Sequence, residues 1–337
     1  MWTLVNQTPY TAERAFVRDQ DGAEVWLVLI KATFDILPDG TLRRARIQPP
    51  VDLVPVYWES VAGPYLRRDS DLVATKAGTE VLVEGCACAP RGHPVTAMEV
   101  ALQVGSMTKR LRVVGDRQWR SGVFGPALSE PQPFERMPIV YARALGGVAP
   151  ASPGEAPPPN PHNPVGTGHA RTQGHLHGIA APNIEAPGAS AQDWQHHGVP
   201  AGFGPLARHW SPRRELAGTF DANWARTRQP LLPADFDERF NFSAPADQCF
   251  RGFLTGGEAI ALHGLSPAGV IRFALPRVHI ACKTLLDGRA QPHGAVLHTV
   301  HIAADKRQVS CVWHSRLRCH RKEHLIERSV VYMEHEA

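Results

Sequence analysis

The sequence predicts a mainly β protein in which two antiparallel, β-sandwich-like regions are joined by a long irregular strap rich in proline and glycine, with a few short helices. Apolar residues alternate with a period of two in the first part of the chain and again in the last part, as in half-buried strands. Between them, residues 146–212 hold 11 glycines and 12 prolines in 67 positions. Proline lacks the ladder donor and ordered glycine is entropically unfavourable, so this segment forms neither a helix nor a central strand.

The length of 337 residues exceeds what one ordinary hydrophobic core supports, so two packed regions are expected. We divide the chain into an N-terminal β domain (1–145), the Pro/Gly/His-rich strap (146–212) and a part with short helices followed by a C-terminal β region (213–337).

The clearest strand of the first region is Val25–Ile36. Its even positions are all apolar, whereas its odd positions become polar at Lys31, Thr33 and Asp35. This pattern predicts a strand with one face buried throughout and the other face emerging into solvent. The turn residues Pro38–Gly40 then end it.

Further strands are expected at Thr79–Cys88, Met98–Val104 and Leu111–Val113, where the alternation returns. The last two runs meet across Gly105 and Ser106, which predicts a hairpin.

The strap permits two interpretations. A segment so rich in proline and glycine could be a flexible linker. However, it also carries Trp194, Phe203, Trp210 and Ile184, and disordered linkers are usually poor in aromatic residues. We therefore favour an irregular but packed strap that lies across the two sheets.

Short helices are expected after the strap. Asp221 could cap a helix over Ala222–Arg228, and Asp235 could cap a turn in which Phe236 and Phe240 have i, i+4 spacing.

Strands then resume with Ile271–Leu275 and Val278–Cys282, and Asp287-Gly288 is a strong hairpin signal. Val296–Ala303 and Val309–Leu317 flank a further turn. The end of the chain, 323–333, fits either a short helix or a last strand.

Charge and targeting signals exclude several classes of function. The chain has 36 basic and 32 acidic residues, scattered rather than clustered, which is not the charge distribution of a nucleic-acid binder. It shows neither a signal sequence nor a run of about 18 apolar residues that could span a membrane. Six cysteines are too few for a disulfide framework. We expect a cytoplasmic protein that binds neither nucleic acid nor membrane.

Histidines and cysteines raise the question of a metal site. Cys311, His314, Cys319 and His320 resemble zinc ligands at first sight. On an alternating strand, however, Cys311 and His314 face opposite ways, so we interpret them as a buried cysteine and an exposed histidine. Cys86 and Cys88 share a strand face and are expected in the core. The strap holds seven histidines without nearby acidic or cysteine ligands at a recognised spacing, and we predict no metal: His162, His169, His175, His177, His196, His197 and His209.

Motifs for catalysis or cofactor binding are weak. The sequence has no Gly-x-Ser-x-Gly elbow, and Cys249 is the only thiol in a polar, loop-like setting. Asn163–Gly168 contains Gly-x-Gly but follows no strand and opens no helix, so it is interpreted as a turn-rich loop. We expect no catalytic residues and no cofactor.

Paired carboxylates leave one alternative function open. Asp221, Asp235, Asp237 and Glu238 lie close in sequence around aromatic residues, and a hydrolase or carbohydrate-active protein needs two carboxyls across a cleft. Helix capping explains Asp221 and Asp235 equally well.

A long central block resembles the signature of a known family, the domain of unknown function 2169. The block comprises Pro200–Trp210, Pro212–Arg214, Gly218–Trp224, Arg228–Asp237, Arg239–Phe242 and Ala244–Gln248. Matching pieces elsewhere are Lys31–Phe34, Val114–Trp119, Pro138–Tyr141, Asn163–Gly168 and Pro182–Glu185. The resemblance covers nearly the whole chain. It departs from the family pattern at Leu145 and His169, where aromatic residues are usual.

This resemblance implies a non-enzymatic adaptor or chaperone. Members of the family look like cytoplasmic proteins that bind a cognate type VI secretion effector, a toxin with a PAAR or Rhs region, and help to load it onto the VgrG spike, with VgrG itself as a further partner. Trp, Tyr and Arg are favoured anchors of protein interfaces. Seven aromatic and arginine residues of the block are therefore candidates for contact with the partner, although each could instead tie the strap to the sheets: Phe203, Trp210, Arg213, Arg214, Trp224, Phe236 and Phe240.

Overall fold

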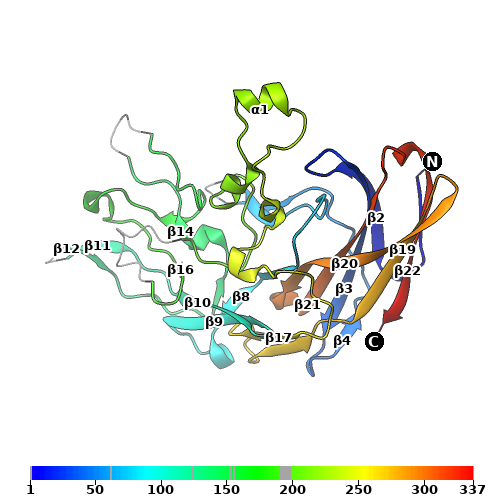
Figure 1. Cartoon of the computed structure of the whole chain (residues 1–337). Coiled ribbons are helices and arrows are strands. Elements are labelled where there is room, and N and C mark those ends of the chain that lie inside the picture. Colours follow the sequence, from blue (N-terminus) through cyan, green and yellow to red (C-terminus); the bar gives the residue numbers. More distant parts are fainter. Residues whose placement is uncertain are drawn as a thin grey trace.

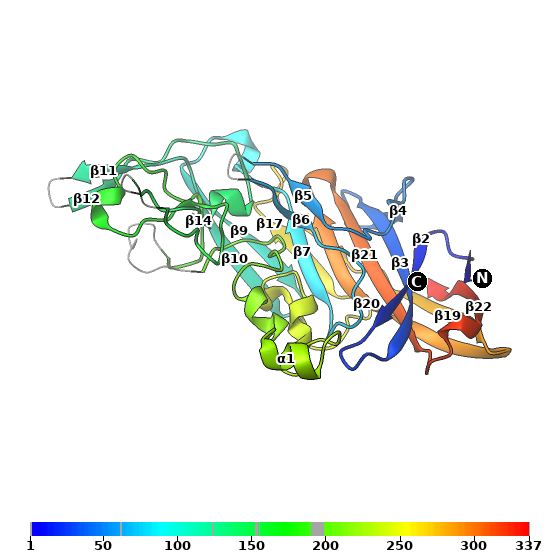
Figure 2. The ribbon, with the colours of Figure 1, turned by 90° about the horizontal axis from the view of Figure 1, so that it is seen from above.

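The computed structural model describes residues 2–60, 63–122, 125–151, 154, 156–189 and 199–336. Strands make up 44% and helices 10% of the chain, so the predicted mainly β fold with a few short helices is confirmed. The molecule is elongated, with a large sheet at one end, the irregular strap at the other and a small helical lobe projecting between them (Figures 1 and 2).

The larger sheet combines strands from both ends of the sequence. Its first strand lies parallel to its last strand, and most of its other pairs are antiparallel. Among the described residues its order is β1 (Thr3–Asn6), β22 (Ile326–Glu336), β19 (Val278–Leu286), β20 (Arg289–Ala303), β21 (Gln308–Arg318), β3 (Glu24–Ile36) and β2 (Thr11–Arg18), with β4 (Leu42–Arg44) beside β3 and β7 (Glu80–Glu84) beside β20.

The smaller sheet also joins distant segments. Its order is β16 (Ile184–Glu185), β10 (Met107–Val114), β9 (Ala97–Val104), β17 (Ala259–His263) and β18 (Ile271–Ala274). Each main sheet thus takes strands from both 1–145 and 213–337. The three predicted ranges describe the composition of the sequence, and they do not correspond to separate sheets, because the pairing is non-local.

Short ribbons and single helical turns complete the described chain. The ribbons pair β5 (Val56–Trp58) with β6 (Tyr65–Arg68), β8 (Cys86–Cys88) with β13 (Arg136–Pro138), β11 (Trp119–Gly122) with β12 (Gly125–Leu128), and β14 (Leu145–Gly146) with β15 (Thr167–Gly168). The helices are η1 (Pro90–Gly92), η2 (Tyr141–Arg143), η3 (Gln173–His175), η4 (Arg213–Ala217), α1 (Ala222–Thr227), η5 (Glu238–Asn241), η6 (Ala246–Gln248), η7 (Ala304–Lys306) and η8 (Glu323–Leu325). Among the described residues, no helix is both long and apolar enough to cross a membrane.

Both predicted hairpins form where the turn residues stand. Val104 pairs with Met107 around a two-residue loop, and Gly105 has a positive φ of 56°. Leu286 pairs with Arg289, and the loop residues Asp287 and Gly288 have φ values of 53° and 66°. Positive φ at both loop positions matches the right-handed twist of the flanking strands, which is why Asp-Gly is favoured there.

The central strand β3 is buried on both faces, which corrects one expectation. Its even residues join the main core, as predicted, and Val25, Leu27 and Leu29 form a second small cluster with Val51. Lys31 and Thr33 do not emerge into solvent but are only 6% and 2% exposed. The chain after β4 folds back over this face, where Gln48 binds the Thr33 backbone and Asp52 and Asp71 bind Lys31 Nζ. The Thr33 hydroxyl lies 2.8 Å from that of Ser310 in β21.

A chain of buried hydrogen bonds crosses the larger sheet. The Trp26 indole donates to the Ser329 hydroxyl at 2.8 Å, and Ser329 lies 2.7 Å from the Thr284 hydroxyl. Thr284 is 2.8 Å from His293 Nε2, and His293 Nδ1 is 2.6 Å from the Ser315 hydroxyl. These residues belong to β3, β22, β19, β20 and β21, so one polar network joins five strands.

The described part of the strap is irregular and packed, which is the interpretation we favour. Phe203, Trp210 and Ile184 are at most 2% exposed and belong to the main core, whereas Trp194 lies outside the described residues. The strap contacts both sheets: the Phe203 carbonyl accepts a hydrogen bond from Val83 N in β7, and β16 pairs with β10.

The capping predictions are half right. Asp221 caps α1, since its carboxylate accepts a hydrogen bond from Trp224 N at 2.7 Å. The second helical turn, η5, is capped by Asp237 instead of Asp235, which binds Thr219. The end of the chain forms η8 followed by the strand β22.

Candidate protein-binding lobe

Residues 213–241, which we call the lobe, project away from both sheets and contain η4, α1 and η5 (Figure 1). The structure describes all of these residues, and none of them is in a strand. The lobe lies within the block that carries the family resemblance.

Arg213 joins the two ends of the lobe, which we call its neck. Its Nε donates to the Phe240 carbonyl at 2.8 Å, so one side chain ties the first residue of the lobe to a residue near its end. Its two terminal nitrogens bind outside the lobe: one donates to the Leu206 carbonyl at 2.7 Å and the other to the Asp69 carboxylate at 2.6 Å. The Arg213 side chain is only 3% exposed. This clasp fixes the lobe to the body of the protein.

Asp69 is the charged partner of this clasp. Its side chain is 9% exposed, and burial by itself raises the pKa of this carboxyl. The positive charges of Arg213 and Arg208 more than offset that effect and hold the pKa below its ordinary value. Asp69 therefore stays ionised and the pair stays charged at neutral pH.

Polar contacts fold the interior of the lobe. The Asp235 carboxylate accepts hydrogen bonds from the Thr219 amide at 3.0 Å and from the Thr219 hydroxyl at 2.7 Å. The Trp224 indole donates to the Leu231 carbonyl at 2.8 Å. These bonds give a segment without strands a defined conformation.

The lobe also contacts the turn between β2 and β3. Arg228 Nη2 donates to the Gln20 carbonyl at 3.3 Å, and the Gln20 amide donates to the Phe236 carbonyl at 3.4 Å. Leu231 packs over Gly22, where a Cβ would lie 2.5 Å from Leu231 Cδ2 and where φ is +78°. Only glycine fits this position without strain.

Aromatic side chains cluster in two pairs on the lobe. The ring centroids of Phe220 and Trp224 are 4.8 Å apart, and those of Phe236 and Phe240 are 5.8 Å apart; both pairs are edge to face. Phe220 is 55% exposed, and the other three are half-buried. A projecting segment therefore presents partly exposed aromatic surface, the kind of surface that protein interfaces use.

The seven residues predicted to bind a partner separate into two groups. Phe203, Trp210 and Arg213 are buried within this chain, where Trp210 packs edge to face on Tyr141 with centroids 5.6 Å apart. Those three position the strap and the neck of the lobe. Arg214 is exposed and Trp224, Phe236 and Phe240 are half-buried on the lobe, so these four can reach a partner. Sequence reasoning missed Phe220, the most exposed aromatic residue of the lobe.

The candidate paired carboxylates have structural roles. Asp221 and Asp237 cap α1 and η5, and Asp235 binds Thr219. Hydrogen bonds from Thr219 lower the pKa of Asp235, and the hydrogen bond from Arg239 lowers the pKa of Asp237. A general acid needs a raised pKa. The geometry gives no support to the hydrolase alternative.

The histidines and cysteines weighed as metal ligands are dispersed. Among the described residues, no group of three or more His, Cys, Asp or Glu side chains could hold a metal ion; His196 and His197 lie outside those residues. Cys311 is buried as expected, but His314 is only 1% exposed instead of solvent-facing, since its ring packs on His298 with centroids 3.8 Å apart. Cys88 is in the core, whereas Cys86 is half-buried.

Two cavities lie outside the seven residues predicted to contact a partner. One is a groove of about 290 Å³ over β3, β7, β20 and β21. It is lined by ion pairs of low exposure, including Lys31 Nζ with the Asp52 carboxylate at 2.6 Å and Arg67 with Glu84 at 2.6 Å. The polar odd positions of β3 were the signal for this groove.

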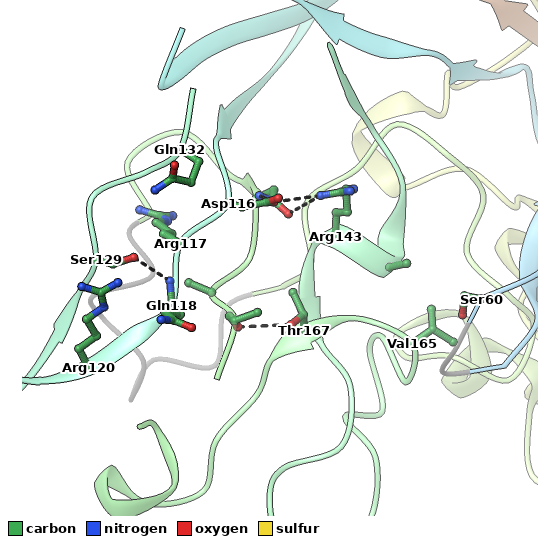
Figure 3. Close-up of a pocket in the computed structure, with 14 residues that line it drawn as sticks. Ser60, Asp116, Arg117, Gln118, Arg120, Ser129, Gln132, Arg143, Val165 and Thr167 are labelled. Carbon is green, nitrogen blue, oxygen red and sulfur yellow. Dashed lines mark hydrogen bonds and ion pairs between the residues drawn. The ribbon is translucent and has the colours of Figure 1, made fainter. Parts of the chain in front are cut away.

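The other cavity is a hollow of about 850 Å³ beside the strap, which we call the arginine hollow (Figure 3). Arg117, Arg120 and Arg143 line it. Three of the separate segments with family resemblance meet around it, namely Val114–Trp119, Asn163–Gly168 and Pro182–Glu185. Their convergence could not be inferred from spacing along the chain.

Comparison with known proteins identifies the family of this chain. The family that matches is DUF2169, described as an uncharacterized protein conserved in bacteria, and the match covers residues 21–314. The search of curated proteins and the search of solved structures each found no match. The matched residues include β3, the arginine hollow and the entire lobe. Since the match spans most of the sequence, the chain belongs to the DUF2169 family.

Proposed function

We propose that this protein is a non-enzymatic cytoplasmic adaptor that binds a cognate effector of a bacterial type VI secretion system, a toxin with a PAAR or Rhs region, and helps to place it on the VgrG spike. The family resemblance implies this role. The observation that best supports a binding function is the lobe, a projecting segment with exposed aromatic surface that Arg213 anchors to the body of the protein.

The lobe has two properties that a binding element needs. Its aromatic side chains supply large contact area with few rotatable bonds, so they lose little conformational entropy when they are covered. Its neck is fixed by the Arg213 clasp, so the surface is already arranged before a partner arrives. A preorganised surface gains affinity because less ordering is needed on binding.

Co-expression with the toxin encoded nearest to this chain tests the proposal. We expect the toxin to be soluble and to co-purify with the tagged adaptor. Phe220→Ala and Arg214→Glu should each weaken the complex about tenfold, because the few anchor residues that dominate an interface each contribute more than about 1 kcal/mol. The measurement is the dissociation constant by biolayer interferometry.

Ile47→Ala is the matched control, since Ile47 is 77% exposed and lies outside the lobe. It should leave affinity unchanged. A toxin that accumulates in soluble form without the adaptor, and does not associate with it, would refute the adaptor function. Equal loss of affinity in Ile47→Ala and Phe220→Ala would refute the role of the lobe.

A further inference from the structure

The arginine hollow has an excess of positive charge. Three arginines line it, and Asp116 is the one carboxylate among the described residues that do so. Figure 3 shows Arg117, Arg120, Gln118 and Gln132 on one side of the hollow, and Arg143 with Asp116 on the other.

Two of the arginines are held by the protein itself. Arg143 Nη1 lies 3.2 Å from the Asp116 carboxylate and donates to the Asn183 amide oxygen at 3.1 Å. Arg117 forms an ion pair with Glu185 and donates to the Pro182 carbonyl at 3.3 Å. These contacts fix the walls of the hollow, so its remaining donors have defined positions.

Two arginines on one wall of the hollow have donors without an acceptor among the described residues. The Arg120 guanidinium is exposed, and no ion pair joins it to any described carboxylate. The Arg117 side chain is only 8% exposed, yet its Nε has no acceptor within the described part of the chain. The Arg117 Nε atom is closed to solvent, so the exposed Arg120 guanidinium is the donor on this wall that an acceptor from outside can reach.

The chemistry of the lining favours a peptide over a simple anion. Besides its arginines, the hollow has the side-chain amides of Gln118 and Gln132, which both donate and accept hydrogen bonds as a peptide backbone requires. Apolar surface from Val165 and Ala181 lies in the same hollow. A volume of about 850 Å³ also exceeds what one phosphate fills.

We propose that the arginine hollow binds an extended acidic segment of the partner protein, with a carboxylate placed against Arg120. This inference rests on the proposed adaptor function and adds a second contact, distant from the lobe. Arginine is suited to this task because its planar guanidinium can bind a carboxylate through two parallel hydrogen bonds.

Fluorescence anisotropy tests the site without the natural partner. The probe is a fluorescein-labelled peptide of alternating glutamate and serine, titrated with the full chain; a lysine–serine peptide is the reverse-charge probe. We expect the acidic probe alone to bind, and Arg120→Glu to weaken its binding at least about tenfold, as for loss of a charge-assisted pair. Arg120→Lys should retain part of the affinity.

Arg289→Glu is the matched control, because Arg289 is exposed at the start of β20 and does not line the hollow. Equal weakening by Arg289→Glu, or no binding of the acidic probe, would overturn the proposal, as would full displacement of the probe by inorganic phosphate at low concentration. The peptide titration measures binding to the hollow alone, whereas co-purification tests the adaptor function. Either proposal can therefore be refuted while the other is supported.

Discussion

The larger sheet and the lobe reach a defined structure by different means. In β3, six successive residues, 25–30, are completely buried, and they lie between the preceding strand β2 and the distant strand β21. In the lobe, most side chains are exposed or half-buried, and hydrogen bonds within 29 residues together with one buried arginine hold the segment. Apolar burial stabilises the sheet, whereas polar contacts shape the lobe.

The difference separates stability from recognition. Changes in the sheet should lower the free energy of unfolding of the whole protein, because its strands share one core. Changes in the lobe should alter binding and local order with a smaller effect on global unfolding, since few apolar contacts are lost. Three predictions test this comparison.

Trp26→Ala should have the largest effect. Trp26 is fully buried and is the β3 end of the hydrogen-bonded network, so the substitution removes a large apolar surface and one of the two hydrogen bonds of the Ser329 hydroxyl, which keeps Thr284 as a partner. We expect a loss of about 3–5 kcal/mol in the free energy of unfolding. Urea unfolding followed by fluorescence measures it. A loss comparable to that of an exposed-site control such as Ile47→Ala would contradict the role given to β3.

Arg213→Ala should have the next largest effect, and it should be mostly local. The substitution leaves the Asp69 carboxylate buried without its closest charge, although Arg208 lies 3.4 Å away. Loss of one partner of a buried pair typically costs about 3 kcal/mol. Limited proteolysis should show cleavage between residues 213 and 241 before the sheets unfold.

Arg214→Ala is the matched control for that experiment. Arg214 is the exposed neighbour of Arg213 and carries the same charge, but it takes no part in the clasp. It should leave both the protease sensitivity of the lobe and the urea midpoint unchanged. Simultaneous cleavage of the lobe and the sheets in Arg213→Ala would show that the two regions unfold as one unit.

Acidification should weaken the sheet before the clasp. Burial lowers the pKa of His293 to about 4, below its ordinary value of about 6.5. Between these two pH values His293 is protonated in the unfolded chain but neutral in the folded chain. The free energy of unfolding therefore falls as pH drops from about 6.5 to about 4, by at most about 1.4 kcal/mol per pH unit for this group. Asp69, whose pKa is lowered, keeps the clasp ionised until pH falls below the ordinary carboxyl range.

His293→Gln provides the check. It should reduce the dependence of the urea midpoint on pH between about 6.5 and about 4, and leave the protease sensitivity of the lobe unchanged over that range. An unaltered pH dependence in this variant would exclude His293 as a contributor.

Local patterns predicted the local structure of this protein. The apolar even positions of β3, the Asp287-Gly288 hairpin and the Asp221 cap depend on neighbours a few residues away, and each is found where expected. The strand pattern places Lys31 in solvent, but in the folded chain the segment that carries Asp52 and Asp71 covers it. The position of that segment depends on tertiary packing. The pattern within a strand carries no information about such a cover.

The candidate sites show the same limit. Aromatic and arginine residues in the family block indicated the lobe, but their composition could not separate a buried clasp such as Arg213 from an exposed Arg214. Asp235 binds Thr219, 16 positions earlier, so a capping rule placed it wrongly. The arginine hollow needs three segments that meet only in the folded chain.

The order of strands in the larger sheet has a consequence for biosynthesis. β3 pairs with β2, which precedes it, but its other neighbour is β21, which begins at residue 308. At about 5–20 residues per second, the ribosome needs tens of seconds to deliver that neighbour. During this time the most apolar strand of the nascent chain has one open edge, so the yield of native protein depends on translation speed and on chaperones that shield β3.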